Sequence, residues 1–109
     1  MTELVRCTLI ETDGARIADV RLNRPDKLNS LTLDLLEELQ GVAESLAGDL
    51  DLRGVLLSGE GRSFCAGLDF ASVMADPQRV QEVFQPEPGR GTNLFQESPW
   101  VWRRLDVPV

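Results

Sequence analysis

The sequence predicts a mixed α/β fold, and three observations support this class. Two segments of alternating apolar and polar residues, 4–11 and 16–23, flank an Asp-Gly pair at 13–14, which is typical of a hairpin turn. A stripe of apolar residues at helical spacing follows in residues 33–47. A short apolar run at 54–58 then leads into a glycine-containing turn. The order strand, strand, helix, strand predicts a helix packed on a small sheet.

The second predicted strand has one apolar face. Alternate residues point to opposite sides of a strand, so one face of this strand is formed by Ala18, Val20 and Leu22. The other face carries Asp19 and Arg21.

The predicted helix at 33–47 has recognisable ends. Thr32 is a suitable N-cap, Asp34 adds negative charge to the first turn, and Gly48 is suited to the C-terminal stop. The apolar stripe comprises Leu35, Leu36, Leu39, Val42, Ala43 and Leu46. The acidic residues away from that stripe are Glu37, Glu38 and Glu44. We interpret these as a solvated helix face rather than as acid–base groups.

The remaining sequence predicts short helices and one loop. Residues 70–75 and 77–84 have helical character, and a proline- and glycine-rich loop covers 85–91. Apolar residues recur at roughly helical spacing in 92–105, where Pro99 either starts or kinks the helix.

Two features near the end of the chain have consequences for packing. Trp100 and Trp102 either pack in the core or line a ligand pocket, and core packing is the favoured interpretation. The apolar residues in 105–109 are typical of the start of a further strand.

Composition excludes several classes of protein. The 109 residues fit one domain, and a net charge of −7 argues against nucleic-acid binding. The chain contains no histidine and two cysteines, which excludes histidine-based triads and standard zinc sites. No signal peptide and no apolar run of membrane-spanning length is visible, so we expect a cytoplasmic protein with reduced thiols. Cys65 is interpreted as a small packed residue.

The stretch 62–70, Arg-Ser-Phe-Cys-Ala-Gly-Leu-Asp-Phe, follows the apolar run and carries the main functional signal. Gly67 allows the backbone to approach a ligand closely, and Asp69 is placed to cap a following helix. The strand, the glycine turn and the first turn of the following helix together direct backbone N–H groups into one space. Such groups stabilise a developing negative charge.

A second stretch, Asn-Arg-Pro-Asp-Lys-Leu-Asn-Ser-Leu at 23–31, lies between the second strand and the helix. The two stretches together resemble the N-terminal half of the crotonase (enoyl-CoA hydratase/isomerase) superfamily. Residues 62–70 resemble its Ala-Gly-x-Asp oxyanion segment, and residues 23–31 resemble its Arg-Pro-x-x-x-Asn-x-Leu segment. The resemblance implies a partial crotonase (ClpP/crotonase-like) spiral fold of ββα units. Residues 1–109 would then be the N-terminal part of a single domain, truncated before the second oxyanion segment.

The resemblance also implies roles for backbone groups in these stretches. The N–H of Leu68 would donate to a thioester oxyanion, and Gly67 would allow close approach of the substrate. Backbone around Ala66 and Leu28 would contact the adenine of coenzyme A. Asp69 would be structural, bonded to the backbone of its own turn.

Four side chains have implied binding roles. Arg24 or Lys27 would approach the phosphates of coenzyme A, and the alternative for both is ordinary solvated charge. Val73 and Met74 would line the acyl pocket.

The implied activity is hydration or double-bond isomerisation of an unsaturated acyl-CoA in fatty acid metabolism. No cofactor is expected beyond the coenzyme A of the thioester substrate. The family's second oxyanion glycine and its acid–base carboxylates come later than the residues present here, and Glu60 and Glu87 do not match those positions. We therefore expect no catalysis by this chain alone, an exposed apolar surface, marginal stability, and association with itself or with a complementary C-terminal chain.

Two alternatives belong to other classes. One is a truncated or split subunit that binds only coenzyme A or a complementary chain. The other is an unrelated nucleotide-binding α/β domain, suggested by the Gly-Glu-Gly sequence at 59–61. Neither the dinucleotide fingerprint nor the P-loop pattern fits the residues around it.

Overall fold

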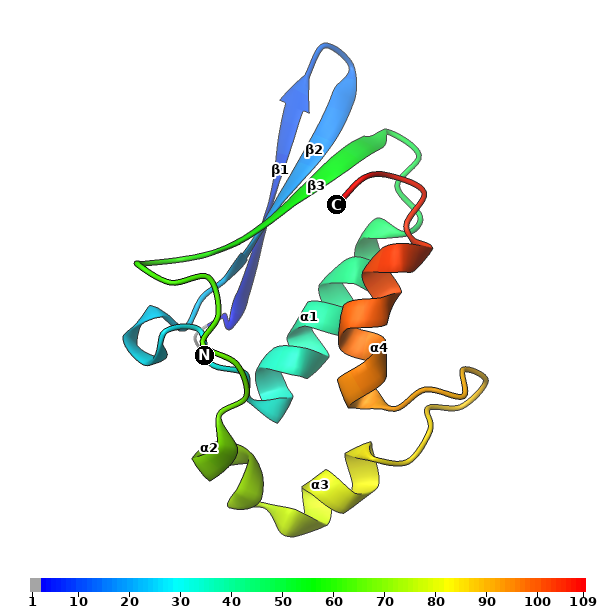
Figure 1. Cartoon of the computed structure of the whole chain (residues 1–109). Helices are drawn as coiled ribbons and strands as arrows, with labels where there is room; N and C mark the ends of the chain where they lie inside the picture. Colours follow the sequence, from blue (N-terminus) through cyan, green and yellow to red (C-terminus); the bar gives the residue numbers. More distant parts are fainter. Residues whose placement is uncertain (1–2) are drawn as a thin grey trace.

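Residues 3–109 are described by the computed structural model, which contains one three-stranded sheet (Figure 1). The strands are β1 (Val5–Thr12), β2 (Ala15–Leu22) and β3 (Leu52–Gly59), in the order β1-β2-β3. β1 and β2 are antiparallel, whereas β2 and β3 are parallel. The predicted α/β class and the predicted order of strands are confirmed.

The hairpin turn between β1 and β2 has the predicted chemistry. Asp13 and Gly14 both have positive φ angles, 48° and 77°. Two consecutive left-handed residues match the twist of the flanking strands, and Asp-Gly is a favoured pair for this conformation.

The helix α1 (Leu33–Leu46) connects β2 to β3 and covers one face of the sheet (Figure 1). The hydroxyl of Thr32 accepts a hydrogen bond from the Leu35 N–H at 3.1 Å, so the predicted N-cap is confirmed. Leu35 and Ala43 are fully buried in one cluster with the apolar face of β2. The helix ends at Leu46 with Ala47 as C-cap, and the predicted stop residue Gly48 directly follows this cap.

One acidic residue of α1 is not part of a solvated face. The Glu38 carboxylate accepts hydrogen bonds from the backbone N–H groups of Leu4 and Val5, at 2.9 and 3.0 Å. It therefore ties the start of β1 to α1. Periodicity cannot reveal this role because the partners lie more than 30 residues away in the sequence.

Two loops hold most of the candidate functional residues. The β2–α1 loop, residues 23–32, contains the short 3-10 helix η1 (Pro25–Lys27). The β3–α2 loop, residues 60–69, leads into α2 (Phe70–Met74). Both loops follow the ends of neighbouring parallel strands, which brings them to the same edge of the sheet (Figure 1).

The C-terminal half forms a second, helical region. α3 (Pro77–Val83) follows α2, and α4 (Leu94–Trp100) lies beside α1 (Figure 1). Pro99 lies inside α4, and the 3-10 helix η2 (Val101–Arg104) continues from its end. No helix in residues 3–109 is both long enough and apolar enough to cross a membrane.

The two tryptophans have different environments. Trp102 is only 7% exposed and belongs to the main core cluster, as the favoured interpretation predicted. Trp100 is half exposed, and the Arg103 guanidinium lies 5.7 Å from the centre of its ring.

The residues after η2 return to the sheet. The carbonyl of Pro108 accepts a hydrogen bond from the Val55 N–H at 2.9 Å. Leu105 and Val107 pack against the main core cluster. This segment begins to pair with the outer edge of β3, as its apolar sequence predicted, although it forms no regular strand.

The outer part of the sheet is poorly covered. Val5 is buried in β1, but Leu9 and Ile10 are each more than 40% exposed, and Leu56 in β3 is 61% exposed. The radius of gyration of 14.6 Å exceeds the value of about 13 Å typical of a compact domain of this size. Leu56 is therefore exposed as expected for the β3 strand, whereas Val55 and most of the apolar stripe of α1, which were expected to lack cover, are buried.

Candidate functional site

The two site loops are joined by a short parallel bridge between Leu31 and Leu68. The Leu31 N–H donates to the Gly67 carbonyl at 2.8 Å, and the Asp69 N–H donates to the Leu31 carbonyl at 2.9 Å. A third bond runs from the Ala66 N–H to the carbonyl of Leu28, at 3.0 Å. These bonds fix the backbone on both sides of Leu68.

The N–H of Leu68 is left free by this arrangement. In a parallel bridge the residue between the two bonded neighbours directs its own N–H and carbonyl away from the partner segment. Within residues 3–109 the Leu68 N–H accordingly has no hydrogen-bond partner. Gly67 has a φ of 100°, a conformation that strongly favours glycine. The Leu68 N–H is therefore a backbone hydrogen-bond donor whose orientation is fixed by its bonded neighbours.

Asn29 is a structural residue of this site to which the sequence analysis assigned no role. Its side chain is fully buried, accepts from the Arg24 N–H at 2.7 Å, and donates to the carbonyls of Glu60 and Ser63 at 2.9 and 2.8 Å. It therefore links the two loops. Its φ of 56° is left-handed, and asparagine tolerates this conformation better than most residues. The asparagine of the Arg-Pro-x-x-x-Asn segment could therefore have been predicted to occupy a left-handed position in this loop.

Gly59 is required at the end of β3 by close packing. A Cβ at this position would lie 2.5 Å from the Phe64 carbonyl oxygen and 2.7 Å from the side-chain nitrogen of Asn29. The side chain of Asn29 thus occupies the space that any larger residue at position 59 would need.

Asp69 is bonded in two directions. One carboxylate oxygen accepts from the Ser72 N–H at 3.1 Å, which confirms its predicted role as the N-cap of α2. The other oxygen lies 2.9 Å from Nη1 of Arg24. The bond from the Ser72 amide and the neighbouring guanidinium hold the pKa of Asp69 below its ordinary value.

The residues implied in coenzyme A binding lie close together on the two loops but differ in their freedom. Arg24 is mostly buried, and its Nη1 also donates to the Ser30 hydroxyl at 2.7 Å and the Ser30 carbonyl at 3.1 Å. Lys27 is exposed. Leu28 has a left-handed φ of 54°, and its carbonyl is used by Ala66. The phosphate and adenine contacts stay predictions.

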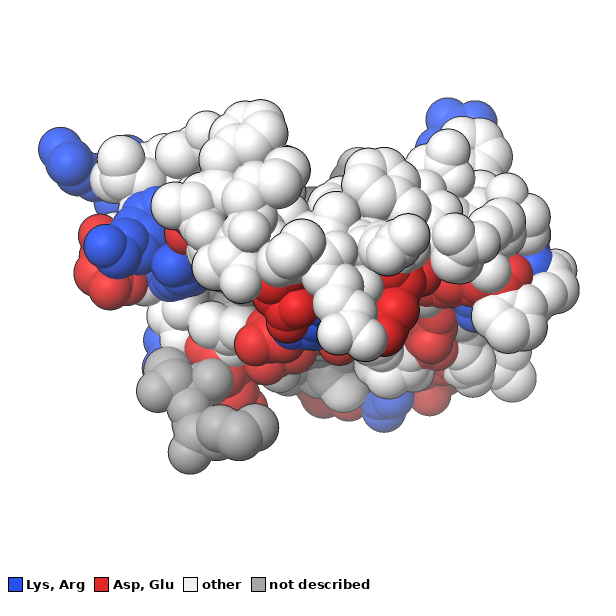
Figure 2. Space-filling model, turned by 90° about the horizontal axis from the view of Figure 1, so that it is seen from below, with Lys and Arg blue, Asp and Glu red and all other residues white. Residues whose placement is uncertain are grey.

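The two residues implied in the acyl pocket lie on α2 in different environments. Val73 is buried with Leu33, Leu36 and Leu94 in a second core cluster. Met74 is 60% exposed. Uncharged side chains cover much of the face that carries α2 and α3, and a group of basic side chains lies at its left edge, on the side of η1 (Figure 2).

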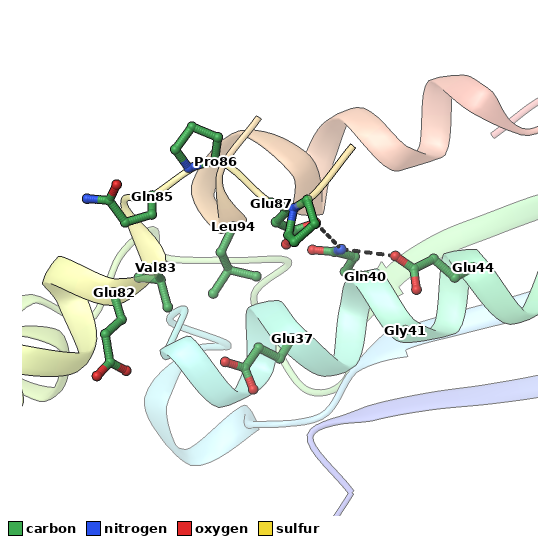
Figure 3. Close-up of a pocket in the computed structure, with 11 residues that line it drawn as sticks. Glu37, Gln40, Gly41, Glu44, Glu82, Val83, Gln85, Pro86, Glu87 and Leu94 are labelled. Atoms are coloured by element: carbon green, nitrogen blue, oxygen red, sulfur yellow. Dashed lines mark hydrogen bonds between the residues drawn. The ribbon is translucent and has the colours of Figure 1, made fainter. Parts of the chain in front are cut away.

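A cavity of about 420 Å³ lies elsewhere, between α1 and the loop that joins α3 to α4 (Figure 3). Its lining includes the carboxylates of Glu37, Glu44, Glu82 and Glu87. Most of these are already neutralised, because Arg79 pairs with Glu37 and Arg90 pairs with Glu44 and Glu87. Among the described residues no cluster of histidine, cysteine and carboxylate groups is suited to a metal ion.

Beside this cavity, Glu97 of α4 is fully buried. Its carboxylate accepts from the Thr92 hydroxyl at 2.6 Å, from Arg90 at 3.0 Å and from Arg104. Glu97 lies in no recognised sequence motif. Its spacing from Leu94 and Val101 places it on the buried side of the helix, which was a usable signal.

Comparison with known proteins identifies relatives of this chain. The model of the enoyl-CoA hydratase/isomerase family matches residues 12–101. A probable enoyl-CoA hydratase of Mycobacterium leprae is 36% identical over the whole of this chain, and the match covers 36% of that relative. A similar probable enoyl-CoA hydratase of Mycobacterium tuberculosis is 32% identical over 96% of this chain and covers 37% of the relative.

Solved structures give the same result. A probable enoyl-CoA hydratase/isomerase from Mycobacterium abscessus matches 89% of this chain and 32% of its own chain, with a TM-score of 0.59 and 35% identity. An enoyl-CoA hydratase from Bacillus anthracis matches 70% of this chain and 30% of its own, with a TM-score of 0.57 and 31% identity. The fold is therefore a partial crotonase fold, and the chain spans about a third of the length of these relatives. The family match, the relatives and the folded loop pair agree, and the chain belongs to the enoyl-CoA hydratase/isomerase family.

Proposed function

We propose that this chain binds an acyl-CoA thioester and donates the Leu68 N–H to the thioester carbonyl oxygen. The observation that carries the proposal is the free Leu68 N–H between two bonded neighbours. In this role the chain supplies one oxyanion donor and part of the coenzyme A site for hydration or isomerisation of an unsaturated acyl-CoA.

The physical basis of the proposal is preorganisation. A donor that is already aimed when negative charge develops needs no reorganisation, unlike water. Loss of one such donor typically costs a factor of about 10²–10³ in rate. Because a backbone group is the donor, the leucine side chain at position 68 is compatible with this role.

We further propose that the described chain binds its ligand without turnover. Hydration needs a group that can exchange protons with water and substrate, and a carboxylate without other partners is suited to this role. Both oxygens of Asp69 are engaged, and Glu60 pairs with Arg6 and Arg21. Neither acidic group of the β3–α2 loop is free for this role.

A second candidate function is a subunit that binds coenzyme A and a complementary protein chain without catalysis. The exposed apolar side chains favour it. Phe64 and Phe70 are 55% and 66% exposed beside the site, and Leu56 is exposed on the sheet. Such surface is available to an acyl chain or to another protein.

Calorimetric titration of the 109-residue chain with crotonyl-CoA, beside a crotonyl-CoA hydration assay, tests these proposals. We expect binding and no hydration. Lys27→Gln should weaken coenzyme A and crotonyl-CoA equally, because it removes a proposed phosphate contact that both ligands share. Turnover by the chain would contradict binding without catalysis. Absence of binding by a folded chain would contradict both candidate functions.

A further inference from the structure

We infer that Arg24 positions the Leu68 N–H and does not serve as a phosphate ligand. This inference rests on the proposed function, which supplies the role of Leu68. It assigns Arg24 a different part in the site from that of the exposed Lys27.

The first support is the set of contacts that the Arg24 guanidinium makes. A single nitrogen, Nη1, contacts the Asp69 carboxylate, the Ser30 hydroxyl and the Ser30 carbonyl, at 2.7 to 3.1 Å. The side chains of Arg24 and Asp69 are each 19% exposed. A guanidinium held in this way is not a freely mobile surface cation.

The second support is the way in which the Arg24 backbone is anchored. Its N–H donates to the buried Asn29 side chain, and its carbonyl accepts from the N–H groups of Lys27 and Asn29. The guanidinium therefore projects from a fixed base and reaches Asp69, 45 residues later in the sequence.

The third support is the place of Asp69 next to Leu68. The Asp69 N–H makes one of the two bonds of the bridge, and its carboxylate caps α2. The Arg24–Asp69 contact therefore ties the side chain of the residue after Leu68 to the opposite loop. Loss of this contact removes the side-chain tie between the two loops and lets the turn that carries the Leu68 N–H shift, while the backbone bonds to Leu31 and the rest of the fold remain.

Lysine is a poor replacement for Arg24. Its ammonium nitrogen lies one bond closer to the backbone than Nη1 of arginine, so it cannot reach Asp69 and Ser30 in the same geometry. Arg24→Lys therefore keeps the charge that a phosphate would need but weakens the contacts with Asp69 and Ser30. Arg62→Lys is the matched control, because Arg62 is exposed on the β3–α2 loop and makes no ion pair within the described residues.

The test compares acetyl-CoA with coenzyme A by calorimetry, because only the thioester has a carbonyl for the Leu68 N–H. A neutral hydrogen bond contributes about 1 kcal/mol, so the wild-type chain should bind acetyl-CoA about fivefold more tightly than coenzyme A. Arg24→Lys should abolish this preference and leave coenzyme A affinity unchanged. Arg62→Lys should retain the preference.

A second variant shows whether a lost preference is caused by loss of the Arg24–Asp69 contact or by unfolding. Asp69→Asn keeps a good N-cap for α2 but removes the charge that attracts Arg24. It should lose the same preference, and the double variant should lose no more than either single one. The thermal melting temperature of each variant identifies any that are unfolded.

The outcomes are distinct. A wild-type chain without preference for acetyl-CoA contradicts the proposed function itself. A preference that survives in Arg24→Lys contradicts only the positioning role. Equal loss of affinity for both ligands in Arg24→Lys makes Arg24 a phosphate ligand and overturns the inference.

Discussion

The molecule contains two polar clusters built from similar groups, and they differ in what they leave unpaired. At the junction of the two site loops, an arginine, an aspartate and a buried asparagine bond the loops to each other, and the Leu68 N–H beside them has no partner within residues 3–109. Around Glu97, two arginines and a threonine converge on one buried carboxylate.

The difference separates a functional candidate from a structural one. In the Glu97 cluster the charged groups neutralise one another, so the cluster stabilises the packing of α4 and its preceding loop. At the loop junction the side chains position the Leu68 N–H, which has no partner in the described part of the chain. The Glu97 cluster is therefore a weaker functional signal than the Leu68 N–H.

The largest effect is expected at Glu97. Glu97→Gln places an amide against two guanidinium groups and removes the charge that they share. Removal of one partner of a buried ion pair typically costs about 3 kcal/mol or more in stability. Urea unfolding should report a loss of about 3 kcal/mol, and the exposed Glu82→Gln should change stability by less than about 0.5 kcal/mol. Equal effects of the two variants would contradict a structural role for the Glu97 cluster.

The next largest effect is expected where Gly59 meets Asn29. Gly59→Ala forces a methyl group against a backbone oxygen and the Asn29 amide, and overpacking of this kind costs about 1–3 kcal/mol. It should also reduce acetyl-CoA binding, because the two loops move apart.

Gly41 provides the matched comparison for that change. It lies in α1, and a Cβ there would have nothing within 4 Å. Gly41→Ala should stabilise the chain by about 0.5–1 kcal/mol because alanine favours a helix. Chemical denaturation measures both variants, and the same sign for the two would contradict the proposed packing.

The smallest effect concerns pH. The folded-state pKa of Asp69 is below its ordinary value of about 3.9. Its contribution to stability is therefore present above that value and is lost as the pH falls through the folded-state pKa. Unfolding measured between about pH 5 and pH 2 should show this loss, and Asp69→Asn should flatten the dependence. A wild-type curve identical to that of Asp69→Asn would contradict the ion pair with Arg24.

Local chemistry explains what the sequence could predict. The Asp-Gly turn, the Thr32 cap and the Asp69 cap each involve partners within three residues, so the pattern of residues determines them. The apolar stripe of α1 and the apolar face of β2 depend on periodicity alone, and both are buried.

The features that could not be predicted depend on distant partners. The bonds of Asn29 to Ser63 and of Glu38 to Leu4 join residues 34 apart, and no local pattern specifies them. Burial in β1 also depends on distant partners. The sequence shows alternation through Cys7 and Leu9, but both are exposed because α1 covers only part of the sheet.

The central claim is that the Leu68 N–H meets the thioester carbonyl, and the Leu68 amide resonance tests it most directly. In a ¹⁵N-labelled chain titrated with acetyl-CoA, the Leu68 amide proton should move downfield, and it should move much less with coenzyme A. A complex with acetyl-CoA in which the Leu68 resonance stays at its free position would contradict the claim.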